Sequence, residues 1–157
     1  MRYLLTTIAL AAAFAAVTAD ARGQGNRQDA VAFLDRVVRL IAANDYASAY
    51  PLLHPRQQRL VAEDEYVACE QMSPIPGKLS LLRVIRSAPE WIHVAGTDDG
   101  RVRSTAVTFE LRLTGVLPGE EATVRLKAHA VSVAGRWAWI LSARRLALHR
   151  SGTCAVV

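Results

Sequence analysis

Two prolines and a glycine within residues 73–77 (Ser-Pro-Ile-Pro-Gly) divide the chain into two parts of different periodicity. Proline lacks the backbone N–H that a helix interior or an inner strand needs, so regular structure stops in this segment. Before it, apolar residues recur every three or four positions, which predicts helices. After it, apolar and polar residues alternate, which predicts strands. Helices followed by an antiparallel meander predict an α+β fold with the helices against one face of the sheet.

Three helices are expected in the first part: from Asp29 up to Asn44-Asp45, Tyr46–Leu53 and Pro55–Met72. The apolar positions of the first share one face: Ala30, Phe33, Leu34, Val37, Leu40 and Ile41. Asp45 can cap the second helix, and Pro51 limits its regularity. The third is expected to break near Ala62.

Five strands are expected in the second part: Leu79–Ser87, Trp91–Ala95, Arg103–Thr114, Thr123–Val133 and Trp137–Leu148. Glycine-rich turns separate the last four strands. Those turns are Gly96–Gly100, Gly115–Glu121 and Ala134-Gly135.

Centring the last two turns on residues 117–118 and 134–135 fixes the register of the last three strands, and Phe109 then pairs with Leu126. One face collects apolar side chains: Val107, Phe109, Leu111, Val124, Leu126, Ala128, Ala130, Trp137, Trp139 and Leu141. The other face is polar, with Glu110 opposite Arg125: Thr108, Glu110, Arg112, Thr123, Arg125, Lys127, His129 and Ser142. A sheet with this separation has one buried face, which the helices must cover.

Residues 1–21 have the anatomy of a cleaved signal peptide. Arg2 precedes an apolar stretch over Leu4–Val17, and small residues follow at Ala19-Asp20-Ala21. An uncleaved anchor is the alternative, but the apolar stretch is shorter than the ~20 residues that cross a bilayer. Residues 22–28 are expected to form a flexible lead, and residues 29–157 a single domain. The protein is therefore expected to be secreted or held in the cell envelope, with no membrane span after cleavage.

Cys69 and Cys154 are the two cysteines of the chain. In an exported protein such a pair is most often a disulfide, and two buried free thiols are the alternative. No metal site is expected, because the four histidines are isolated and lack metal-ligand spacing. The net charge of +5 is scattered along the chain, so no nucleic-acid partner is expected.

The order of elements resembles the nuclear-transport-factor-2-like superfamily, whose relatives include ketosteroid isomerase and the SnoaL-type polyketide cyclases. The stretch Asn44–Pro55 is similar to its second-helix segment, and Gly135–Leu141 to its last strand. Tyr66 and Cys69 on one helix with a late Cys154 resemble exported bacterial members. The resemblance implies three N-terminal helices packed in the concave face of a strongly bent, cone-shaped sheet. It also implies an apolar mouth that takes a small ligand or pairs subunits, without implying an activity.

Six aromatic residues are candidates for lining a ligand pocket: Tyr50, Tyr66, Trp91, Phe109, Trp137 and Trp139. Packing in the core is the alternative for each of them. No catalytic residue is assigned, because acid/base chemistry needs a titratable group inside the mouth. The remaining candidates for that role have structural alternatives such as rim packing or a helix cap: Tyr46, Tyr50, Tyr66, Asp64 and His93.

The leading hypothesis is an exported, non-enzymatic domain that binds a small apolar ligand or a protein partner, without a cofactor. The partner would be a second copy or another envelope protein, bound through the mouth or the polar sheet face. The alternative is a small-molecule isomerase, cyclase or dehydratase that uses the cone as its pocket.

Overall fold

The computed structural model describes residues 27–72, 75, 77–116 and 119–154, and it has an α+β fold with a four-stranded antiparallel sheet in the order β1-β2-β3-β4. This confirms the α+β class and the antiparallel sheet expected from the sequence. A helix over 27–42 comes first. The elements that follow are α2 (Tyr46–Ala49), the 3-10 helix η1 (Tyr50–Leu52), α3 (Pro55–Gln58), α4 (Glu63–Met72), β1 (Lys78–His93), β2 (Arg101–Thr114), β3 (Glu121–Val133), β4 (Arg136–Trp139) and α5 (Ala143–Ser151).

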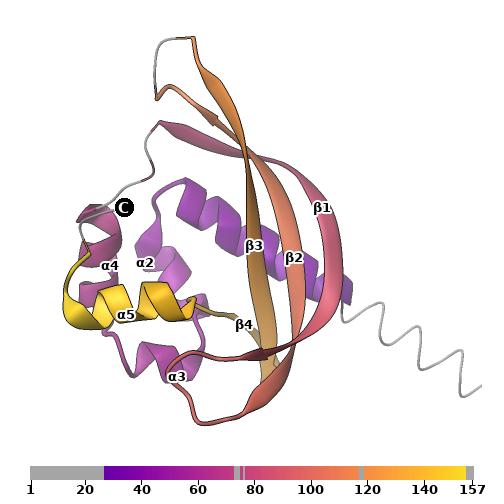
Figure 1. Ribbon diagram of the computed structural model, residues 1–157, viewed down its shortest axis with the longest axis vertical. Helices are drawn as coiled ribbons and strands as arrows, with labels where there is room; N and C mark the ends of the chain where they lie inside the picture. The colour runs from indigo at the N-terminus through magenta and orange to yellow at the C-terminus, as the bar shows by residue number, and fades with distance from the viewer. Residues whose placement is uncertain (1–26, 73–74, 76, 117–118, 155–157) are drawn as a thin grey trace, which may run out of the picture.

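Figure 1 shows the helices gathered on one side of the sheet, with α5 beside α4 and the end of the β1–β2 hairpin reaching α3. The helix over 27–42 turns its apolar stripe inward, and Leu34 and Val37 on it are buried. Together with aliphatic and aromatic residues of β2, β3 and β4 they form one hydrophobic core. The apolar periodicity of the sequence therefore marks the helix face that packs against the sheet.

The predicted interruptions of the helical half are confirmed. Asn44 has a positive φ of 56°, and the Asp45 side chain accepts a hydrogen bond from Ser48 N as the cap of α2. The third expected helix breaks between α3 and α4. Two details differ from the expectations. Residues 27 and 28 belong to the first helix and not to a flexible lead. The carboxylate that accepts a hydrogen bond from Ala62 N, before α4, is that of Glu65 and not that of Asp64.

β1 is one strand where the sequence predicted two. Pro89 favours a break, but β1 pairs with β2 along its length, and Pro89 lies opposite Thr105. Among the described residues no strand pairs with the other edge of β1, so an imino acid is tolerated there. Leu82 and Ile85 are extra residues at two shifts of register. Such bulges locally bend and twist a strand.

The predicted register of the central strands is confirmed. Phe109 pairs with Leu126, Glu110 with Arg125, and Ala130 with Trp139. The Glu110 carboxylate nevertheless contacts Arg83 of β1, at 2.7 Å. The turn geometry thus fixes which backbone positions pair, but a side chain such as that of Glu110 can form its ion pair with a residue on either neighbouring strand.

The prediction of a last strand over residues 137–148 is wrong beyond Trp139. Ser142 caps α5, its hydroxyl accepting from Arg145 N, and Gly152 ends the helix in the left-handed conformation with φ 65°. Serine is a strong N-cap, and a residue without Cβ adopts positive φ without strain. The segment therefore turns back onto α4 as a helix instead of extending the sheet.

Gln57 joins three parts of the fold from the end of α3. Its Nε2 donates to the carbonyl oxygens of Ala95 and Leu141, at 3.0 and 3.1 Å. Leu141 N donates to its Oε1 at 2.8 Å. The side chain is fully buried, and it satisfies a half-buried backbone group after β1 and buried backbone groups after β4.

The predicted signal segment and residues 22–26 of the lead lie outside the described residues. Within the described part of the chain, no helix combines the length and apolar character needed to cross a bilayer.

His54 should make stability depend on pH. It caps α3 by accepting a hydrogen bond from Arg56 N at its Nδ1, and burial lowers its pKa. Histidine in the unfolded chain titrates near 6.5, so the unfolded state takes up a proton at higher pH than the folded state. The free energy of unfolding is therefore expected to fall as pH drops through about 6.5 toward the lower folded pKa. Urea denaturation at a series of pH values measures it.

The matched variants for this pH effect are His54→Asn and His93→Asn. Asparagine caps a helix without titrating, so His54→Asn should lose less stability on acidification than wild type. His93 is exposed at the end of β1, so His93→Asn should keep the wild-type dependence. Parallel pH profiles for wild type and His54→Asn would contradict the assignment.

Candidate functional site

Three of the predicted pocket residues lie in the hydrophobic core. Tyr66 and Phe109 are 1% and 0% exposed, and Trp139 is 8% exposed. The Trp139 indole N–H donates to Ala49 O at 3.1 Å. These rings fill the space between sheet and helices, so they do not line an open mouth.

Tyr50 and Trp91 have different surroundings. Tyr50 packs against Tyr66 with ring centroids 5.6 Å apart, and its hydroxyl donates toward two carbonyls, Gln58 O and Val61 O. Its hydroxyl is thus occupied by the backbone. Trp91 is 60% exposed on β1.

Trp137 is the predicted pocket residue that borders a cavity beside the apolar sheet face. This cavity has a volume of about 310 Å³ and receives residues from the helix over 27–42 and from all four strands. Its lining is Arg27, Pro89, Arg103, Ser104, Thr105, Ser132 and Trp137. The volume is at the lower end of the range for small-molecule sites, and the indole is its largest apolar surface.

The cavity is electropositive. Arg27 and Arg103 are exposed, and neither forms an ion pair with any residue in the described part of the chain. Thr105 and Ser132 add hydroxyl groups. A guanidinium fork binds carboxylate, sulfonate or phosphate oxygens, while an indole offers a flat apolar surface. The arrangement suits a small molecule with an anionic group and an aromatic or aliphatic body.

The titratable candidates do not converge. The Tyr46 hydroxyl donates to Asn44 Oδ1 at 2.6 Å, and burial raises its pKa. Burial raises the pKa of Tyr66 as well, so both phenols stay protonated. Asp64 and His93 are exposed on α4 and β1. None of these four side chains lines the cavity beside Trp137.

A serine, a histidine and a glutamate follow one another on the polar sheet face. Ser104 Oγ lies 3.2 Å from His129 Nδ1, and His129 Nε2 lies 3.8 Å from Glu90 Oε2. Lys127 contacts the other oxygen of Glu90 at 2.6 Å. The Ser104 hydroxyl donates to Glu90 O at 3.0 Å and is buried, so its proton is engaged and it has no access to a substrate. Burial lowers the pKa of His129. The contacts among Ser104, His129 and Glu90 join neighbouring strands on the polar sheet face, and Ser104 and His129 do not form a nucleophile–base pair.

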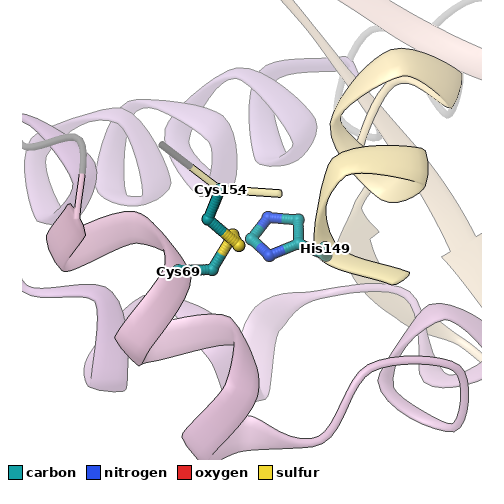
Figure 2. Close-up of side chains that lie close together, drawn as sticks. All are labelled: Cys69, His149 and Cys154. Carbon is teal, nitrogen blue, oxygen red and sulfur yellow. A yellow bond between two sulfur atoms is a disulfide. The ribbon is translucent and has the colours of Figure 1, made fainter. Parts of the chain in front are cut away.

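The predicted disulfide between Cys69 and Cys154 is confirmed, and it joins α4 to the segment after α5 with a Cα–Cα distance of 5.0 Å. Figure 2 shows the imidazole ring of His149 beside the two sulfur atoms. Glu70 lies next to Cys69 in the chain and is buried, and its carboxylate contacts both Arg145 and His149. A buried charge is tolerated only when it is paired, and here both carboxylate oxygens have a partner.

This group of Glu70, Arg145 and His149 was missed in the sequence. Tyr66, Cys69 and Glu70 are spaced three and four residues apart, which puts Glu70 on the buried side of α4. That spacing was the available signal. Arg145 was assigned to a strand that ended at Leu148, one residue before His149, and the buried face of α5 was therefore not recognised.

No family model, curated protein or solved structure matches the chain.

Proposed function

We propose that the protein is an exported, non-enzymatic domain of the nuclear-transport-factor-2-like type that binds a small anionic molecule with an apolar body. The cavity of about 310 Å³ bordered by Trp137, Arg27 and Arg103 is the observation that carries the proposal. The ligand packs its apolar part on the indole, and its anionic group pairs with the guanidinium groups. This refines the purely apolar ligand expected from the sequence, because the lining is polar as well as aromatic.

Export is supported by the composition of residues 1–21 and by the disulfide, which persists in oxidising compartments. The nuclear-transport-factor-2-like type is supported by the element order, in which helices precede an antiparallel meander. Binding is preferred to isomerase, cyclase or dehydratase chemistry because the described lining of the cavity contains no Asp, Glu, His or Tyr.

Anilinonaphthalene sulfonate tests the site, because it combines an aromatic body with one anionic group. We expect one saturable site on the native protein, measured by dye fluorescence and calorimetry. Arg103→Gln should weaken binding about tenfold, since a charge-assisted hydrogen bond contributes about 1.5–3 kcal/mol and 1.4 kcal/mol is a factor of ten. Arg125→Gln, on the opposite sheet face, should leave binding unchanged.

Two results would contradict the proposal. One is equal affinity of the wild-type and Arg103→Gln proteins. The other is dye binding that does not saturate, which is typical of loosely packed protein rather than of a defined site. Near-ultraviolet circular dichroism of each variant serves as the control for native packing. A dye displaced by a second protein, but not by small anions, would favour a protein partner at the same surface.

A further inference from the structure

The disulfide and His149 form a compact group of potential metal ligands. One ring nitrogen of His149 and the sulfur atoms of Cys69 and Cys154 all lie within 4.8 Å of one another. The Cys69 and His149 side chains are buried, and that of Cys154 is half-buried. Figure 2 shows the three side chains converging from α4, from α5 and from the segment that follows it. Three ligands of this kind, from elements fixed by packing, match the donor set of a Cys2His zinc site.

The two ring nitrogens of His149 have different surroundings. Nε2 lies 2.9 Å from Glu70 Oε1, and in the tautomer with the proton on Nε2 this nitrogen donates to that carboxylate. Nδ1 is then an acceptor, and it is buried without a hydrogen-bond partner in the described protein. A buried polar atom without a partner calls for an explanation. Here that atom belongs to a ring that lies beside two sulfur atoms (Figure 2).

Glu70 and Arg145 supply the outer contacts that zinc-binding histidines usually have. The second Glu70 oxygen contacts Arg145, which holds the carboxylate in place. A ligating histidine generally donates its other N–H to a carboxylate, and this contact fixes the ring and strengthens the ligand. Here Arg145 contacts Glu70, Glu70 contacts His149, and His149 would bind the metal, which follows that arrangement.

The site also has a route to solvent. A cavity of about 570 Å³ lies against Cys69, His149 and Cys154, between the ends of α4 and α5. An ion can therefore reach the sulfur atoms without unfolding of the core. Entry, ligand identity and outer contacts are the properties by which a metal site is judged, and all three are present.

We propose that the reduced protein binds Zn²⁺ through the thiolates of Cys69 and Cys154 and the Nδ1 of His149, so that the disulfide and the metal are alternative links between α4 and the C-terminal segment. A thiol or phosphine reductant gives two electrons, and two protons are taken up as the S–S bond breaks, which leaves two thiols and the oxidised reductant. Zn²⁺ then displaces one proton from each thiol. Two thiolates and an imidazole select a borderline-soft ion over Mg²⁺ or Ca²⁺. A water completes the fourth position.

The test compares the oxidised and reduced full-length mature protein, with a phosphine reductant under anaerobic conditions and a chromophoric zinc chelator as competitor. The reduced protein is expected to bind one Zn²⁺, and the oxidised protein none. Co²⁺ in the same site should give an absorption band from thiolate-to-metal charge transfer. Cys154→Ser should weaken binding at least about 100-fold, more than the loss of an outer contact costs. His93→Gln, an exposed histidine on β1, should bind like wild type.

Glu70→Gln separates the ligands from the residue that positions them. It should keep the thiolate-to-cobalt band, because no ligand changes, while zinc affinity falls about 10- to 100-fold. His149→Gln should bind zinc at least as weakly as Cys154→Ser, and its cobalt spectrum should differ from that of wild type.

Three outcomes would overturn the proposal: a folded reduced protein that binds no zinc, equal zinc affinity of wild type and His149→Gln, or a reduced protein that unfolds and that zinc does not refold. Far-ultraviolet circular dichroism identifies the folded state in each case. The cavity beside Trp137 shares no residue with this site, so the anionic dye tests the proposed function separately.

Discussion

Gln57→Ala is expected to lower the free energy of unfolding by about 3–5 kcal/mol. The change leaves the carbonyls of Ala95 and Leu141 and the N–H of Leu141 without their partner, and it opens a cavity in a fully buried position. Each unsatisfied buried group costs about 1–3 kcal/mol. Urea denaturation followed by circular dichroism measures the difference.

Gln58→Ala is the matched control for this effect. Gln58 is the neighbouring glutamine, half-buried, and its side chain makes one hydrogen bond, to Tyr50 O. Its removal should cost about 1 kcal/mol. Equal losses for the two variants would show that Gln57 does not join the β1–β2 turn to the segment after β4.

Reduction of the disulfide between Cys69 and Cys154 is expected to lower the free energy of unfolding by about 4–5 kcal/mol in the chain-entropy treatment. The bond spans a sequence separation of 85, so it removes much of the freedom of the unfolded chain. Urea denaturation with and without a phosphine reductant, in the presence of a metal chelator, gives the difference.

The double variant Cys69→Ser/Cys154→Ser supplies the control for reduction. Its stability should match that of the reduced protein, and the reductant should not change it. An unchanged urea midpoint of the wild-type protein on reduction would contradict the expected stabilisation. Intact mass before and after reduction should differ by two hydrogens.

The sequence predicted the sheet register because the relevant signals are local. Turns at 115–121 and 134–135 and strict alternation on both sides place Phe109 opposite Leu126 without knowledge of the rest of the fold. The extent of the edge strand β1 was less predictable. Whether Pro89 breaks a strand depends on whether its N–H side faces a partner, which only the assembled sheet decides.

The C-terminal helix was missed because two patterns overlap there. Leu146 and Leu148 alternate as in a strand, yet Ser142 and Gly152 are typical N- and C-terminal helix signals. The residues between them contain no β-branched side chain, which favours a helix. This error hid the pairing of His149 with Glu70, since those residues are 79 positions apart and meet only when α5 folds back onto α4.

The six pocket candidates were chosen because they are aromatic, and the structure places them in different surroundings. Burial of Tyr66, Phe109 and Trp139 follows from how closely the helices approach the sheet, and the sequence pattern does not contain that distance. Trp137 pairs with Ser132 near the start of β4, and it borders a cavity that Arg27 of the helix over 27–42 also lines. Arg27 and Arg103 reach it from distant elements, so no local motif marks them.

The bond between Cys69 and Cys154 closes the polypeptide into a covalent ring that contains all four strands and α5. One backbone cut inside that ring, for example by a protease at the exposed residues 98–100, opens the ring without dividing the molecule. The two pieces would stay together until the disulfide is reduced. A nicked protein would therefore keep its mass, apart from one added water, and could continue to hold its sheet in register.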